Sequence, residues 1–155
     1  MNATKYLEEI NACHTLFLTA LDEPSPNSLR LVLREGRITK TPVSIEIAGQ
    51  CLGEGYPVQI DDSCATFELN WNVYVRYQIT NESFGLFVPE NRGREHATCR
   101  RESDFLEYLS RSSTASNEYP GALVHFQFVC SDHIVDIVST SHPHLRKMAP
   151  AVRIH

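Results

Sequence analysis

The sequence predicts one α+β domain built on a largely antiparallel, curved sheet, with an N-terminal helix and one further short helix packed on one face. Residues 67–79 alternate strictly between apolar and polar side chains, which is typical of a strand with one buried face. Other short alternating runs follow with brief connections, which favours antiparallel pairing into a sheet of about five to seven strands. A chain of 155 residues suits a single domain over 1–155.

Charge restricts the classes of function. The chain carries 14 lysine and arginine residues against 19 aspartate and glutamate residues, a formal net charge of −5. This acidic balance disfavours nucleic-acid binding, because neutralisation of phosphates supplies much of that affinity. The N-terminus lacks the long apolar stretch of a signal peptide, and no window approaches the roughly 20 apolar residues of a membrane span. We therefore expect a cytoplasmic protein without a membrane partner.

Five cysteines are present, an odd number. No two of them are close enough to form the CxxC pair of a zinc ribbon, so neither a zinc ribbon nor a disulfide framework is expected. Reduced thiols fit a cytoplasmic protein, and we expect no cofactor.

The first segment predicts an amphipathic helix. Its apolar residues recur at steps of three and four, which places them on one face: Tyr6, Ile10, Cys13, Phe17 and Leu21. Pro24 and Pro26 prevent continuation of this helix, because proline lacks the amide hydrogen that a helix interior needs.

Strands are expected next. Three runs predict them: 29–34, 43–48 and 56–60. Gly49, Gly53 and Gly55 are expected in turns or bulges. The clearest strand covers 67–79, and at about 3.3 Å per residue it would exceed about 40 Å if straight. We therefore expect it to bend or to contain a bulge, and to be followed by a strand over 84–88.

The second half predicts one helix and one hairpin. After a polar loop over 89–101, Ser103 is expected to be the N-cap of a short helix. A loop then leads to two paired strands, 122–130 and 133–140. The tail is expected to be coil or one helical turn.

The final hairpin carries the best-defined polar constellation. If Ser131 and Asp132 form a two-residue turn, His125, Gln127 and Asp136 share one face, with Gln127 opposite Asp136 and His125 diagonal to it. A nearby carboxylate raises the pKa of a histidine and orients its ring, as in a general base. The alternative, which we favour, is a structural hydrogen bond on a half-exposed sheet face. His125 and Asp136 are therefore only candidates for catalysis.

Histidines cluster late in the chain. Together with Asp136, the late histidines His133, His142 and His144 could ligate a divalent ion, since imidazole and carboxylate are suitable donors. Their spacing matches no zinc signature, however, and a histidine at the start of a strand is commonly a surface or capping residue. We therefore expect no metal site.

The polar face of the long strand is a candidate binding surface. It presents a row of hydrogen-bonding groups: Asn70, Asn72, Tyr74, Arg76 and Gln78. Tyrosine and arginine are enriched at binding hot spots, so this face would suit a protein or a polar ligand. The alternative is the solvated outer face of a sheet.

A basic loop surrounds Cys99. Its arginines could lower the pKa of the thiol or bind a phosphate: Arg92, Arg94, Arg100 and Arg101. The alternative that we favour is a loop whose charged side chains are simply solvated.

Four pieces between residues 67 and 140 resemble a set of small bacterial proteins of unknown function. They are the strand end 77–84, the helix 104–108, the Tyr-Pro-Gly of 119–121 and the strand 133–139. The resemblance covers about half of the chain. By analogy, proteins of this size and type resemble immunity or accessory proteins of bacterial toxins.

Taken together, these features favour a non-enzymatic protein-binding module, immunity-like or regulatory, of a bacterial cytosol. The absence of a familiar catalytic motif, the acidic charge and the polar sheet faces favour a protein partner, plausibly basic. The alternative is a small-molecule or metal-dependent enzyme that uses the His125/Asp136 region. The oligomeric state stays open.

Overall fold

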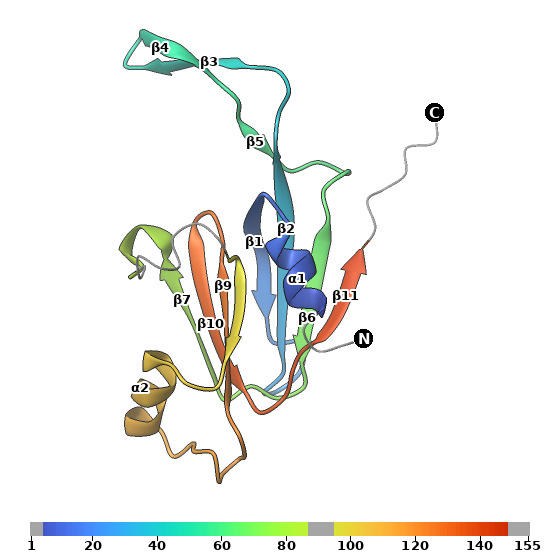
Figure 1. Cartoon of the computed structure of the whole chain (residues 1–155), viewed down its shortest axis with the longest axis vertical. Coiled ribbons are helices and arrows are strands. Elements are labelled where there is room, and N and C mark those ends of the chain that lie inside the picture. The colour runs from blue at the N-terminus through green and yellow to red at the C-terminus, as the bar shows by residue number, and fades with distance from the viewer. Residues whose placement is uncertain (1–4, 87–94, 149–155) are drawn as a thin grey trace.

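The protein is a mostly antiparallel assembly of strands with two α-helices, which confirms the α+β class (Figure 1). The structure, a computed structural model, describes residues 5–86 and 95–148. The strands form two main sheets and a separate two-stranded hairpin. The prediction of one curved sheet is therefore wrong.

The first sheet has the order β1-β2-β6-β11, and β5 pairs with the end of β2. Its strands are β1 (Thr15–Asp22), β2 (Leu29–Ile38), β5 (Val58–Gln59), β6 (Thr66–Trp71) and β11 (His144–Met148). Every pairing in it is antiparallel. Leucines of β2 lie opposite apolar residues of β6, and together they form one buried face.

The second sheet has the order β7-β10-β9-β8. Its strands are β7 (Arg76–Asn81), β8 (Ala97–Arg100), β9 (Val124–Val129) and β10 (His133–Ser139). Strands β9 and β10 pair in the predicted register, with Asp136 opposite Gln127. The amide of Cys130 donates to the carbonyl of His133, which closes the turn at Ser131 and Asp132.

The two sheets face each other across the main core. Trp71 of β6 is 1% exposed, and its indole meets the rings of Phe126 and Phe128 of β9 edge-on, at centroid distances of 5.5 and 6.3 Å. Figure 1 shows the two sheets side by side, and the main core cluster draws its apolar residues from both of them. The core is thus a layer between sheets rather than a layer beneath helices.

The predicted long strand divides between the two sheets. β6 ends at Trp71 in the first sheet, and β7 begins at Arg76 in the second. In the connection, the amides of Tyr74 and Val75 donate to the carbonyls of Asn27 and Val138. The expectation of a bend is confirmed, but a single strand over 67–79 is wrong, because the chain leaves the first sheet after Trp71 and enters the second at Arg76.

The N-terminal helix is shorter than predicted. α1 covers Lys5–Asn11, and the residues that should have continued it form β1. Pairing with β2 buries Leu16, so tertiary contacts override the helical spacing of residues 13–21. The side chain of Asn11 bonds both the amide and the carbonyl of Ala97, at 2.8 and 3.0 Å, so α1 docks on the backbone of edge strand β8.

The second helix begins where the sequence predicted. α2 covers Asp104–Ser112, and the Oγ of Ser103 accepts a hydrogen bond from the amide of Leu106, as an N-cap does. Leu109 is fully buried in a second, smaller apolar cluster with Leu123 and Val138. Val138 projects from the outer face of the second sheet, and α2 therefore covers part of that face.

Three other segments differ from prediction. A short 3-10 helix, η1 (Glu82–Phe84), stands where a strand was expected to begin. β8 occupies the end of the predicted polar loop, and β11 occupies the predicted coil tail. Both are edge strands of mixed composition, so their conformation depends on the neighbouring strand rather than on their own alternation.

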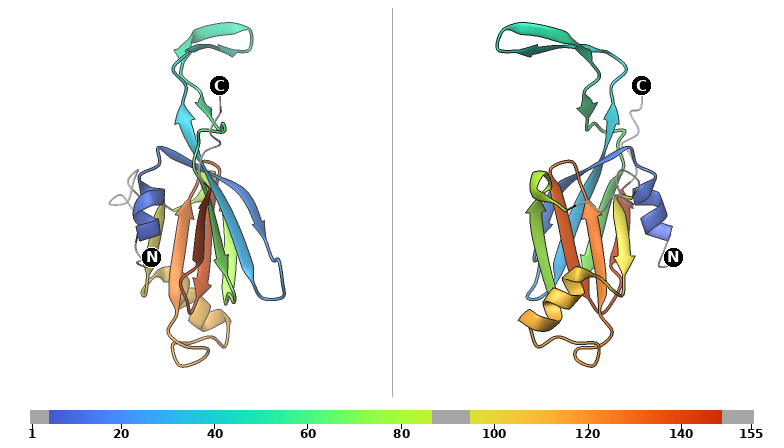
Figure 2. Two further views of the ribbon diagram at one scale, coloured as in Figure 1. Left: turned by 90° about the vertical axis from the view of Figure 1, so that its right-hand side faces the viewer. Right: turned by 60° about the vertical axis from the view of Figure 1, so that its left-hand side comes forward.

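The remaining strands form a hairpin that stands clear of both sheets. β3 (Val43–Ile47) and β4 (Gln50–Gly55) pair only with each other among the described strands. Ala48 and Gly49 both have positive φ, as the two-residue turn of a hairpin requires. We call residues 38–59 the arm. Figures 1 and 2 show it extending beyond the end of β2, away from the packed sheets.

Candidate functional site

A buried polar cluster lies on the outer face of the second sheet. His125 and Asp136 are 3% and 6% exposed, and the Nε2 of His125 lies 2.7 Å from the Oδ1 of Asp136. Gln127 donates to the same Oδ1 at 3.0 Å, and Gln78 of β7 donates to Oδ2 at 3.2 Å. The carboxylate on β10 is therefore held by groups from the two flanking strands, β9 and β7, and the two groups on β9 lie in the predicted arrangement.

A third residue, Ser103, extends the cluster from the sheet to α2. Its Oγ lies 2.8 Å from the Nδ1 of His125, on the opposite side of the ring from Asp136. When Nε2–H donates to the carboxylate, neutral imidazole has its lone pair at Nδ1, where it accepts the serine hydroxyl proton. The result is a chain of hydrogen bonds from Ser103 through His125 to Asp136.

The sequence reasoning predicted Ser103 only as a helix cap and missed its contact with the histidine. Nothing in the local pattern pointed to it, because Ser103 precedes His125 by a helix, a loop and a strand. The contact depends on where α2 docks on the outer face. The ring of Phe105 in the first turn of α2 lies 5.1 Å from the imidazole and helps to cover it.

The environment keeps Asp136 ionised. Burial raises its pKa, but hydrogen bonds from His125, Gln78 and Gln127 and the charge of His125 outweigh that effect. The pKa of Asp136 is therefore below its ordinary value of 3.8. The folded protein therefore holds the carboxylate form more strongly than the unfolded chain does.

This shift predicts an acid-dependent loss of stability. The contribution of Asp136 is fully present above the unfolded pKa of about 3.9 and is lost as pH falls through the lower folded pKa. Urea titrations between pH 7 and pH 3 should show the free energy of unfolding of wild type falling more steeply below about pH 4 than that of Asp136→Asn. Equal slopes in the two proteins would contradict the assignment.

The predicted binding row is not one surface. Asn70 lies on β6 of the first sheet and donates to Glu68, whereas Arg76 and Gln78 lie on β7 of the second. Asn72 and Tyr74 occupy the connection, where the hydroxyl of Tyr74 donates to a carboxylate oxygen of Glu23. The row is broken because the chain changes sheets between Trp71 and Arg76.

The late histidines are also apart. His133 begins β10 in the second sheet, whereas His144 begins β11 in the first, opposite Asn70. His142 lies in the connection between β10 and β11, and its Nδ1 is 3.4 Å from the hydroxyl oxygen of Tyr6. Across residues 5–86 and 95–148, no group of three or more potential ligands converges on a metal position.

The thiol of Cys99 does not have the lowered pKa that its arginine neighbours could have produced. Burial raises the pKa of its thiol, and the opposing effect of Arg101 is smaller. Arg92 and Arg94 lie outside the described residues. Arg100 and Arg101 thus belong to the end of β8 and the turn before α2 rather than to a long basic loop.

The arm exposes a second candidate surface that the sequence reasoning missed. Seven of its large apolar side chains are exposed: Ile38, Val43, Ile45, Ile47, Leu52, Tyr56 and Val58. Ile47 and Leu52, near the tip, are 62% and 63% exposed. The alternation over 43–48 correctly predicted a strand, but it implied a buried apolar face, and the described residues do not bury that face.

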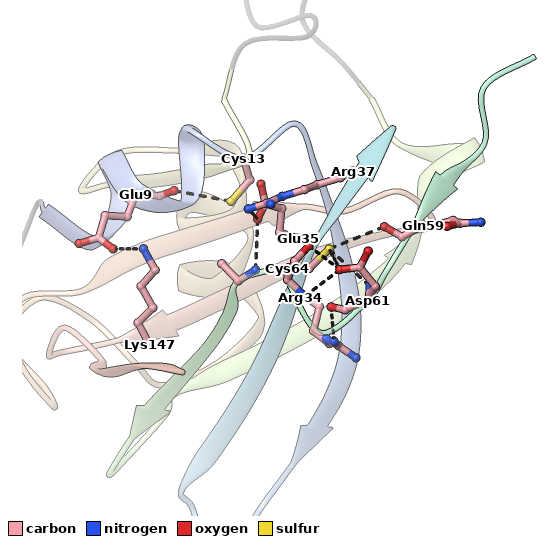
Figure 3. Close-up of polar contacts among 11 residues, drawn as sticks. Glu9, Cys13, Arg34, Glu35, Arg37, Gln59, Asp61, Cys64 and Lys147 are labelled. Carbon is pink, nitrogen blue, oxygen red and sulfur yellow. Dashed lines mark hydrogen bonds and ion pairs between the residues drawn. The ribbon is translucent and has the colours of Figure 1, made fainter. Parts of the chain in front are cut away.

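Polar contacts fasten the root of the arm to the body (Figure 3). The Oε2 of Glu35 accepts from Arg37 at 3.0 Å and from the amide of Ala65 at 3.1 Å. Arg34 donates to the carbonyl of Asp61 at 3.1 Å, so β2 is joined to the chain returning from the arm. These contacts hold the two chain segments on either side of the arm to each other.

Known proteins provide no further guide. No family model, curated protein or solved structure matches this chain. Neither α1 nor α2, the two α-helices in the described part of the chain, is long and apolar enough to cross a membrane.

Proposed function

We propose that the protein is a protein-binding module of a bacterial cytosol, immunity-like or regulatory, and that the arm is its non-enzymatic docking element. The observation that carries the proposal is the set of exposed apolar side chains on a hairpin that projects from the body. Contiguous exposed apolar surface is typical of a protein-interaction site. The polar fastening at the root supports this role, because a preorganised surface loses less conformational entropy on binding.

The charges of the arm define the chemistry of the partner. The charged residues of the arm are Lys40, Glu46 and Glu54, so its two acidic residues outweigh one basic residue. The whole chain is also acidic, with a net charge of −5. A partner with an apolar patch bordered by lysine or arginine would therefore complement both the apolar surface and the negative charge of the arm. This is the basic protein partner that the composition favoured.

The test uses matched double variants of the full chain. Ile47→Thr/Leu52→Thr removes the apolar tip and places there β-branched threonines, which suit a strand. Val73→Thr/Met148→Thr removes two exposed apolar side chains outside the arm, which are 57% and 39% exposed. Proteins recovered from the source cell on tagged wild type are identified by mass spectrometry, and each is purified and titrated against the three proteins by calorimetry.

We expect a purified basic partner whose Kd is about 30-fold or more weaker for the arm variant, since loss of two hot-spot side chains costs about 2 kcal/mol or more. The control variant should bind like wild type. Recovery of no partner, or equal affinity of the partner for wild type and the arm variant, would overturn the proposal.

A further inference from the structure

We propose that Ser103, His125 and Asp136 form a nucleophile–base–acid relay that transfers small acyl groups from carboxylic esters to water. This inference goes beyond the docking role, because it concerns the outer face of the second sheet beside α2. In Figure 1, α2 lies at the opposite end of the molecule from the β3–β4 hairpin. The two proposals can therefore stand or fall separately.

The first argument is the direction of the hydrogen bonds. Asp136 accepts from the Nε2 of His125 at 2.7 Å, and Ser103 lies 2.8 Å from Nδ1. The ionised carboxylate selects the tautomer with its hydrogen on Nε2, so Nδ1 is the free base that faces the hydroxyl. Serine hydrolases use the same three roles with the two ring nitrogens exchanged, and either nitrogen can accept the proton.

The second argument is the gradient of burial along the relay. Asp136 and His125 are buried, whereas Ser103 is only partly buried, so the hydroxyl end is the one that a substrate can reach. Gln78 and Gln127 hold the carboxylate from either side. The base and its charged partner are thus oriented in a dry environment, where the charge of Asp136 stabilises an imidazolium more strongly than in water.

The position of Ser103 at the start of α2 supplies the third argument. The amides of Leu106 and Glu107 bond to the side chain and carbonyl of Ser103. The amides of Asp104 and Phe105, in the same first turn, have no carbonyl acceptor within the helix. These N–H donors follow the nucleophile by one and two residues, and the relay would use them to stabilise the negative charge that develops on the carbonyl oxygen of an attacked ester.

The chemistry follows from these positions. The Oγ of Ser103 forms a bond to the ester carbonyl carbon as its proton moves to Nδ1 of His125, and the carbonyl π electrons move to the oxygen. Collapse of this intermediate breaks the bond to the alcohol oxygen, which takes the proton from Nδ1. Water then attacks the acyl-serine, again with Nδ1 as base, and the proton returns to Oγ. The net reaction is ester plus water to acid plus alcohol.

The test compares the full-length wild type with Ser103→Asn. Asparagine is an N-cap as good as serine, so the variant retains α2 but lacks the nucleophile. The probes are a biotinylated fluorophosphonate, with the labelled peptide located by mass spectrometry, and 4-nitrophenyl acetate. Subtracting the Ser103→Asn rate removes hydrolysis by the remaining histidines and thiols, which the two proteins share.

We expect the label on Ser103 of wild type, no label at position 103 of Ser103→Asn, and ester hydrolysis above the shared background in wild type only. Asp136→Asn should lower kcat/KM by about 10³-fold or more, because it removes the charge opposite the imidazolium while retaining the shape. Equal labelling and hydrolysis in wild type and Ser103→Asn would overturn the relay, as would wild type that neither labels nor hydrolyses the ester.

Discussion

Replacing Trp71 by alanine should lower the free energy of unfolding by about 3–5 kcal/mol, the largest loss expected from a single apolar residue of this protein. Trp71 is 1% exposed and contacts Phe126 and Phe128 across the space between the two sheets. It also ends β6, just before the chain crosses to the second sheet. Truncation would therefore open a cavity where the sheets are joined both by packing and by the chain.

The matched control for this prediction is Trp71→Phe. The indole Nε1 has no hydrogen-bond partner among the described residues, so phenylalanine loses part of the ring contact but no hydrogen bond. We expect this variant to lose about 1–2 kcal/mol. Because the chain contains a single tryptophan, unfolding in urea should be followed by far-ultraviolet circular dichroism. A loss below about 1 kcal/mol for Trp71→Ala would contradict the two-sheet core.

The second large effect is expected from Asp136→Ala, with a loss of about 3–5 kcal/mol at neutral pH. The substitution removes the acceptor of three hydrogen bonds, from His125, Gln127 and Gln78. These donors lie on the two strands that flank β10, and the imidazole is buried, so water cannot replace the carboxylate without opening the sheet face. The loss should also loosen α2, which is tied to His125 through Ser103.

The control for Asp136→Ala is Asp136→Asn. Its side-chain oxygen can still accept from His125 and Gln127, so we expect a loss of only about 1–2 kcal/mol. Hydrogen exchange of the α2 amides would show whether the helix loosens with the cluster. Exchange as slow in Asp136→Ala as in wild type, with unchanged stability, would contradict a structural role for the cluster.

The stability and activity predictions for this cluster can be separated. Ser103→Asn leaves the His125–Asp136 pair in place and removes only the hydroxyl, whereas Asp136→Ala removes the acceptor that holds the sheet face. A cluster that serves folding alone would make Asp136→Ala unstable and leave ester hydrolysis unchanged in Ser103→Asn. The relay requires that Ser103→Asn lose ester hydrolysis above background while the His125–Asp136 pair keeps the protein folded.

The local pattern of apolar and polar residues was sufficient to predict the β9–β10 hairpin. Alternation assigns each side chain to a face, and a two-residue turn sets the register, so the positions of His125, Gln127 and Asp136 followed from chain spacing alone. The N-cap of α2 was predictable for the same reason, since a cap is defined by its own few residues. Both features depend on contacts between residues close in sequence.

The long alternating segment shows where local pattern fails. Its alternation of apolar and polar residues is continuous, yet β6 and β7 belong to different sheets. Alternation defines the apolar face of a strand but does not define which element covers that face. The proposed row from Asn70 to Gln78 depended on that missing information. The helix predicted over residues 15–22 was wrong for a similar reason, since these residues pair with β2 and form a strand despite their helical spacing.

Sequence alone therefore established the fold class, the faces of the hairpin strands and the start of α2, all of which depend on spacing along the chain. Tertiary structure alone decided that the strands divide into two facing sheets, that Ser103 meets His125, and that the apolar face of the arm stays exposed. The physical reason is that burial and hydrogen bonding act between any groups that come close in space. Local periodicity specifies an apolar or polar face, and only the packed chain determines its neighbour.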